Sequence, residues 1–122
     1  MKRVLLSINP EHVSNIISGR KKYEYRKIVA KQEVSSIYIY ETTPVKRIVA
    51  EAEVLGVIKL PPNQLWELTK QYSGISKCFF DTYFQDRQVA YAYELGKVTV
   101  YEKPRKLIDF GVKAAPQSFV YI

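Results

Sequence analysis

One stretch decides how the rest of the chain is interpreted: Gly19-Arg20-Lys21-Lys22-Tyr23-Glu24-Tyr25-Arg26-Lys27. It holds five cations, one carboxylate and two tyrosines in nine residues. The tyrosines alternate with polar residues, which predicts a strand with two different faces. Alternate strand residues lie roughly 6.6 Å apart on one face, so Glu24 and Arg26 can converge on one small ligand or pair with each other. Lys21 precedes the regular alternation, and its direction stays open.

The length and composition predict one globular domain, residues 1–122. Of these residues 47% are hydrophobic and 25% are charged, which is ordinary globular composition. No apolar run approaches the ~20 residues of a membrane span, and the single cysteine, Cys78, excludes an internal disulfide. We therefore expect no membrane association and a cytoplasmic location. The net charge of +7 favours an anionic partner, of which nucleic acid is the commonest, although a merely soluble basic surface would carry the same charge.

Hydrophobic periodicity predicts a mostly β chain with short helices. A helix over 10–18 is expected to begin at Asn9 and Pro10 and to end at Gly19. Pro104 is expected to end the last long strand, because proline cannot donate to a sheet ladder. The predicted strands are 3–8, 22–26, 35–41, 45–60, 88–103 and 119–122, with further helices over 63–72 and after Ser76. Several of these strands look bent at glycines, and such a sheet tends to curl into a small barrel.

Several short motifs together resemble one known family. They are Ser7-Ile8-Asn9-Pro10, Gly19-Arg20-Lys21, Glu24-Tyr25-Arg26 and Tyr40-Glu41-Thr42-Thr43-Pro44-Val45. In this order they resemble the ASCH domain, of the PUA-like superfamily. The resemblance implies an α+β, mostly β fold: a small PUA-like β-barrel of five or six strands with flanking short helices. It also implies a charged cleft beside the first helix.

The same resemblance implies an RNA-related function. The expectation is an RNA- or nucleotide-binding domain with a basic cleft around the GRKKYEYR strand. The alternative is a small amidohydrolase that deacylates N4-acetylcytidine, or a ribonuclease that uses the same cleft. In the amidohydrolase pattern the catalytic lysine falls on Lys21 and the motif arginine on Arg26, while Glu24 stands where those enzymes carry a catalytic threonine. Glu67 is the nearest candidate for their catalytic glutamate.

Four further residues are candidates for ligand binding: Ser7, Tyr40, Gln117 and Ser118. Tyr40 precedes a turn at a strand end and could stack on a base, whereas most of the ten tyrosines are expected to be structural. The only histidine, His12, and Cys78 give no spacing for zinc, so we expect no metal and no cofactor. A solvated strand face with an ordinary Glu–Arg ion pair is the alternative to a cleft. A protein-interaction domain built on the tyrosine-rich surface is a third possibility.

Overall fold

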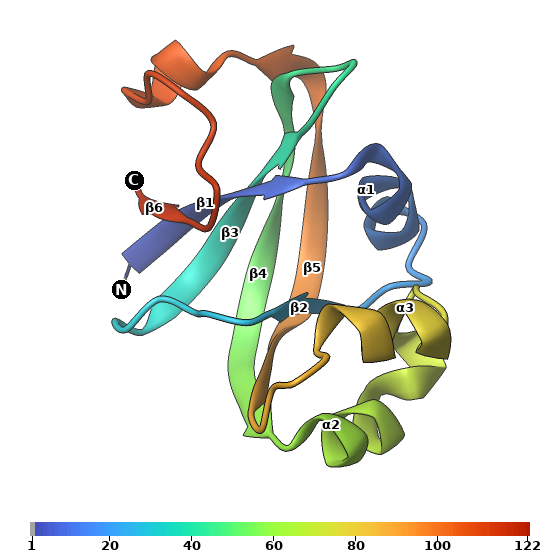
Figure 1. Ribbon diagram of the computed structural model, residues 1–122. Helices are drawn as coiled ribbons and strands as arrows, with labels where there is room; N and C mark the ends of the chain where they lie inside the picture. The colour runs from blue at the N-terminus through green and yellow to red at the C-terminus, as the bar shows by residue number, and fades with distance from the viewer. Residues whose placement is uncertain (1) are drawn as a thin grey trace.

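The computed structural model describes residues 2–122, which form one curled sheet with the three α-helices along one side (Figure 1). The strands pair in the order β2-β5-β4-β3-β1-β6. The β1–β3 pair is parallel, and the other pairs are antiparallel. The elements are β1 (Lys2–Ile8), α1 (Pro10–Ile17), β2 (Tyr23–Arg26), β3 (Val34–Glu41), β4 (Arg47–Leu60), α2 (Pro62–Thr69), η1 (Lys70–Tyr72), α3 (Lys77–Tyr83), β5 (Ala90–Arg105), η2 (Leu107–Phe110) and β6 (Val120–Tyr121).

The sheet is open, so the predicted barrel closure is not confirmed. Within residues 2–122, β2 and β6 are its two edges, and no ladder joins them. Register shifts in β4 and β5 bend these long strands, as expected where bulges interrupt a ladder. The curl brings the edge strand β2 toward β1, where Arg26 Nη2 donates to the carbonyl oxygen of Ser7 at 3.0 Å. A side chain therefore makes the connection that a closed barrel would make with backbone.

Two apolar clusters fix the helices against the sheet. Val13 and Ile16 of α1 pack with the buried residues of β1, β3 and β4. Leu65 of α2 and Phe80 of α3 pack with Tyr25 of β2. A third cluster lies under η2 and the C-terminal segment. None of the described helices is long and apolar enough to cross a bilayer.

The capping and proline signals in the sequence predicted the helix positions, but they did not predict every end of a helix or strand correctly. Gly19 lies just past the end of α1 with φ of 85°, a left-handed conformation that glycine adopts without strain. The Ser76 hydroxyl caps α3 by accepting from Phe79 N at 3.0 Å. Asn9 makes no side-chain cap, because its Oδ1 instead accepts from the Thr42 hydroxyl at 3.3 Å. Pro104 does not end β5, which continues to Arg105. It lies where the β4–β5 register shifts, and a missing donor is tolerated there.

Candidate functional site

A cavity of about 150 Å³ lies where the end of β1, the start of α1, β2 and the α3 region meet. Its polar wall comes mainly from β1, α1 and β2, and its apolar wall from the segment 75–83. The lining residues are Ser7, Ile8, Asn9, His12, Lys21, Glu24, Tyr25, Arg26, Ile75, Phe79 and Tyr83. The structure thus brings Ser7, Lys21, Glu24 and Arg26 together, four of the predicted site residues.

Lys21 points into the protein, which settles the direction that the sequence left open. It is 3% exposed, and its Nζ donates to the carbonyl oxygen of Ser73 at 2.9 Å. The Nζ also lies 4.6 Å from the centre of the Tyr25 ring. Gly74 is needed beside it, because a Cβ there would overlap the Lys21 stem. An ammonium has three N–H donors. Only one of them is used within residues 2–122, so the other two can serve a ligand.

Glu24 and Arg26 form a buried, forked ion pair. The Arg26 Nε and Nη2 atoms both donate to Glu24 Oε2, at 3.1 and 2.9 Å. Glu24 Oε1 lies 3.9 Å from Lys21 Nζ and accepts no hydrogen bond within the described residues. Of the two arrangements that the strand spacing allowed, the structure shows the pair. The cavity therefore offers a ligand both a hydrogen-bond acceptor, the free Glu24 oxygen, and hydrogen-bond donors, the spare N–H groups of Lys21.

The three charged side chains carry a net charge of +1 and are largely buried. Burial and the neighbouring Arg26 guanidinium lower the pKa of Lys21, and Glu24 opposes this shift. The first helical N–H groups of α1 have no intrahelical acceptor, and the N-terminus of a helix attracts anions. Ile8, Asn9 and His12 line the cavity at the start of this helix. The cavity therefore receives positive potential both from the charged side chains and from the N-terminus of α1.

His12 is a cavity residue that sequence reasoning considered only as a metal ligand. Its ring packs edge-on against Phe79, with the ring centres 5.3 Å apart. Its Nδ1 is buried and has no hydrogen-bond partner within residues 2–122. Burial lowers the pKa of His12, the positive charge of Lys21 lowers it further, and Glu24 raises it. The ring is therefore a neutral proton acceptor at neutral pH. The sequence signal that could have identified His12 as a cavity residue is its position in the first turn of the helix that follows the Ser7 motif.

The apolar wall was also missed by sequence reasoning. It is formed by Ile75, Phe79 and Tyr83, which belong to or precede α3. Burial raises the pKa of the Tyr83 hydroxyl, and that of Tyr25 rises to about 12. Both phenols are therefore neutral over the physiological range. The spacing of Phe79 and Tyr83 predicted a helix, but it could not show that this helix covers the strand carrying Lys21.

The remaining predicted residues lie outside the cavity lining. Glu67 is exposed on α2, where its Oε2 accepts from Lys70 at 2.7 Å, so the structure does not bring it to Lys21. Tyr40 is buried with Leu5 and Ile48 in the third apolar cluster. Gln117 and Ser118 are exposed.

The C-terminal segment nevertheless reaches the edge of the site. The Ser7 hydroxyl donates to the carbonyl oxygen of Pro116 at 2.8 Å. The backbone carbonyl of Ser7, on the same residue, is the one held by Arg26 inside the cavity. Ser7 thus joins the two regions, and its hydroxyl positions the chain just before Gln117. Within residues 2–122 no group of three or more His, Cys, Asp or Glu side chains is placed to hold a metal ion.

One protein family is matched over most of the chain. The profile of the ASCH domain matches residues 6–106. An ASCH domain-containing ribonuclease of Zymomonas mobilis is 30% identical over 95 residues, which are 77% of this chain and 64% of that protein. The ATP synthase subunit alpha of Ureaplasma parvum is 27% identical over 98% of this chain, which spans only 15% of that protein's length.

The fold is shared with crystal structures of the ASCH protein of Zymomonas mobilis. That structure superposes with a TM-score of 0.90 at 26% identity, covering 99% of this chain and 87% of the other. A tyrosine-to-phenylalanine mutant of the same protein gives a TM-score of 0.90 at 25% identity, covering 100% of this chain and 91% of the other.

Proposed function

Because the chain belongs to the ASCH domain family, we propose that it is an RNA- or nucleotide-binding domain and that the cavity beside α1 is the binding site. The observation that carries the proposal is the buried net charge of +1 formed by Lys21, Glu24 and Arg26 at the start of α1. The Zymomonas mobilis relative, named as a ribonuclease, supports RNA as the ligand class.

The charge balance favours a phosphate over a neutral group. A buried charge is costly unless it is paired, and here one carboxylate faces two cations. A phosphodiester carries the single negative charge that balances the site. The unused Lys21 donors and the helix N–H groups are of the types that bind phosphate oxygens.

The apolar wall adds a place for a base. Cavities of about 150 Å³ take one benzene-sized ring, so this cavity holds one ring or one phosphate group but not a whole nucleotide. With a phosphate in the cavity at the α1 end, the base would lie outside it, against the half-exposed Phe79 ring. Stacking on an aromatic side chain contributes about 1–3 kcal/mol per base. Glu24 Oε1 would accept from an amine or a ribose hydroxyl.

The test is fluorescence anisotropy of a labelled single-stranded RNA octamer against Lys21→Met. Lys22→Met is the matched control, since the adjacent Lys22 is exposed over the Tyr72 ring and carries the same charge. We expect Lys21→Met to weaken binding at least tenfold, and Lys22→Met to weaken it by about fivefold at most, the effect of one phosphate contact at 0.1 M salt. Equal effects of the two variants would show that the cavity is not the binding site.

A ribonuclease is the second candidate, and His12 is the observation that favours it. A neutral imidazole could take the proton of a ribose 2′-hydroxyl as its oxygen bonds to phosphorus. The bond between phosphorus and the 5′-oxygen would break, and the departing 5′-oxygen would take a proton from water. Lys21 and Arg26 would stabilise the charge on the phosphorane. Cleavage of a fluorogenic RNA by the native chain but not by His12→Gln would support this activity. A substrate with a 2′-deoxyribose at the cleavage site should resist both proteins, and cleavage of that substrate would refute this mechanism.

The amidohydrolase alternative has less support. Of the three residues that it needs, Lys21 and Glu24 line the cavity, while Glu67 is on the surface of α2. One Glu24 oxygen is also held by Arg26. Incubation with N4-acetylcytidine, followed by chromatography for cytidine, decides this point. Release by the native chain and not by Lys21→Met would establish the amidohydrolase.

A further inference from the structure

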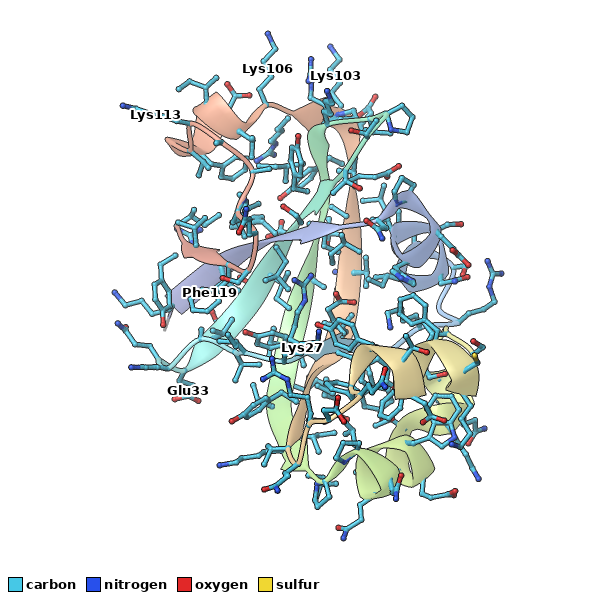
Figure 2. All side chains as sticks on the ribbon, in the orientation of Figure 1. Lys27, Glu33, Lys103, Lys106, Lys113 and Phe119 are labelled. Carbon is cyan, nitrogen blue, oxygen red and sulfur yellow. The ribbon has the colours of Figure 1, made fainter. Side chains whose placement is uncertain are left out.

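A cluster of six cations lies at the end of the sheet away from α2, outside the cavity. Lys46 lies in the β3–β4 turn and Arg47 begins β4, and the others come from the end of β5 and the segment after it (Figure 2). We call this set the sheet-end cluster: Lys46, Arg47, Lys103, Arg105, Lys106 and Lys113. Only three carboxylates belong to the same segments: Glu41, Glu102 and Asp109.

None of these cations is neutralised by an ion pair. Within residues 2–122 the cations that form ion pairs are Lys21, Arg26, Lys70 and Lys77, all outside the cluster. The Asp109 carboxylate accepts from the backbone N–H of Lys106 at 3.1 Å. The cluster is therefore a concentrated positive surface rather than a network of salt bridges, and this is what phosphate groups bind.

Two cluster residues are held in place by the fold. The Arg105 guanidinium lies 4.2 Å from the centre of the Tyr101 ring and 5.8 Å from that of Phe110. Lys46 has a φ of 53°, a left-handed conformation that is uncommon for lysine, and its carbonyl accepts from Arg47 Nη1 at 2.8 Å. Backbone strain of this kind is often found where a residue is positioned for binding.

The register of the sheet makes the cluster continuous with the cavity. Ser7 pairs with Tyr40, Tyr40 with Ile48, and Ile48 with Arg105. With neighbouring strands about 4.8 Å apart, three steps separate Ser7 at the cavity from Arg105 by about 14 Å along the sheet. A stacked strand of nucleic acid spans that distance in about four nucleotides, at about 3.4 Å each.

A second series of paired strand residues links the cavity to the cluster in fewer steps. Ile8, which lines the cavity, pairs with Glu41, and Glu41 pairs with Arg47, which is only two strand steps away. The Thr42 N–H also donates to the Ile8 carbonyl at 3.1 Å, so the β3–β4 turn rests on the cavity wall.

From this continuity we propose that the sheet-end cluster binds the phosphates of the nucleotides that adjoin the one whose phosphate lies in the cavity. The partner is single-stranded RNA, which crosses the β3–β4 turn from the cavity mouth. This inference rests on the proposed function, and it adds the direction and length of the RNA. Short ligands fill the cavity alone, whereas ligands of about five or more nucleotides engage both parts.

The test compares two triple variants of equal charge. Lys103→Gln, Lys106→Gln and Lys113→Gln are combined in one chain, and Lys31→Gln, Lys59→Gln and Lys97→Gln in the control chain. All six lysines are exposed, and none forms an ion pair within the described residues. Binding of a dinucleotide and an octanucleotide is measured by anisotropy across a salt series.

We expect the cluster variant to lower the log–log salt slope for the octanucleotide by about 2, at about 0.7 per lost phosphate contact. This slope corresponds to a loss of about 100-fold at 0.1 M salt, since each contact contributes about fivefold there. The control variant should keep the native slope, and dinucleotide binding should be the same in all three proteins.

Three outcomes would overturn the inference. Equal losses in the two triple variants would show an effect of net charge alone, and an equal loss on the dinucleotide would show damage to the cavity. Binding of phosphatidylserine vesicles that is lost in the cluster variant, with octanucleotide binding unchanged, would assign the surface to a membrane. Failure of the native chain to bind either oligonucleotide at low salt would instead refute the proposed function itself.

Discussion

Replacing Glu24 by glutamine tests the charge balance of the cavity most directly. Glu24 is 6% exposed, and it is the only carboxylate among the residues that line the cavity. The substitution keeps the shape and one acceptor oxygen, but it leaves Lys21 and Arg26 without a counter-charge. Breaking a buried ion pair on one side costs about 3–5 kcal/mol. The Arg26 side chain is 15% exposed, and this partial access to water reduces the expected loss to about 2–4 kcal/mol.

This decrease in the free energy of unfolding is large enough to measure by thermal and by urea unfolding. At about 2.1 cal/mol/K per residue, a chain of this length has an unfolding entropy of about 0.26 kcal/mol/K, so a 3 kcal/mol loss lowers the Tm by about 12 °C. Urea unfolding should show a lower midpoint with an unchanged slope. Glu67→Gln is the matched control, because it breaks an exposed Glu–Lys pair and should cost about 0–1 kcal/mol.

The same variant has an opposite effect on ligand binding. With Glu24 neutral, the cavity charge rises from +1 to +2, so affinity for a phosphate ligand at low salt should rise or hold, while a ligand recognised through an amine should bind more weakly. A stability loss no greater than that of Glu67→Gln would show that solvent screens the cavity charges. That result would refute the reasoning from buried charge on which the proposed site depends.

Three further variants probe single groups of the cavity. Lys21→Met should raise the free energy of unfolding at pH 7, because burial lowers the pKa of Lys21 and the charged form is costly in the folded state. In the native protein this cost decreases as the pH rises from the lowered pKa toward 10.5, so the native protein should become more stable relative to the variant. Urea unfolding of both proteins between pH 7 and 9.5 measures this difference. His12 has a pKa below its usual 6.5, so native stability should fall as pH drops below 6.5 toward the lowered pKa, and His12→Phe should lose this dependence. Protonation of His12 also adds positive charge beside Lys21, Glu24 and Arg26, so anion binding should tighten at acidic pH in the native chain but not in the variant. Tyr25→Phe should remove the Thr69 hydrogen bond. It should also reduce the stability loss that the native chain shows above pH 10, where unfolded tyrosine ionises first, while Tyr83, Tyr93 and Tyr101 maintain the rest of that loss.

The features that the sequence predicted correctly are encoded by residues close together in the chain. The period-2 pattern of Tyr23–Arg26 put Glu24 and Arg26 on one face, and the Ser7 to Lys21 motifs placed that strand beside the first helix. These features depend on neighbours in the chain, and propensities, turns and strand alternation report such neighbours well. The same information located the caps at Gly19 and Ser76.

The sequence could not show which surfaces meet across the fold. Lys21 is buried because Gly74 and the Ser73 carbonyl, more than fifty residues later, close over its side chain. Glu67 and Tyr40 looked suitable by residue type, but the packing of α2 and of the third apolar cluster directs them elsewhere. Barrel closure likewise depends on how far two sheet edges approach.

By itself, then, the sequence determined the family, the strand and helix order and the charged face of β2, since each is encoded by residues close together in the chain. The tertiary structure alone decided that His12, Phe79 and Tyr83 line the same cavity as Lys21, and that the sheet-end cluster lies a few strand steps from it. Cavities and surfaces are made by segments far apart in sequence, and their contacts follow from packing rather than from any local pattern.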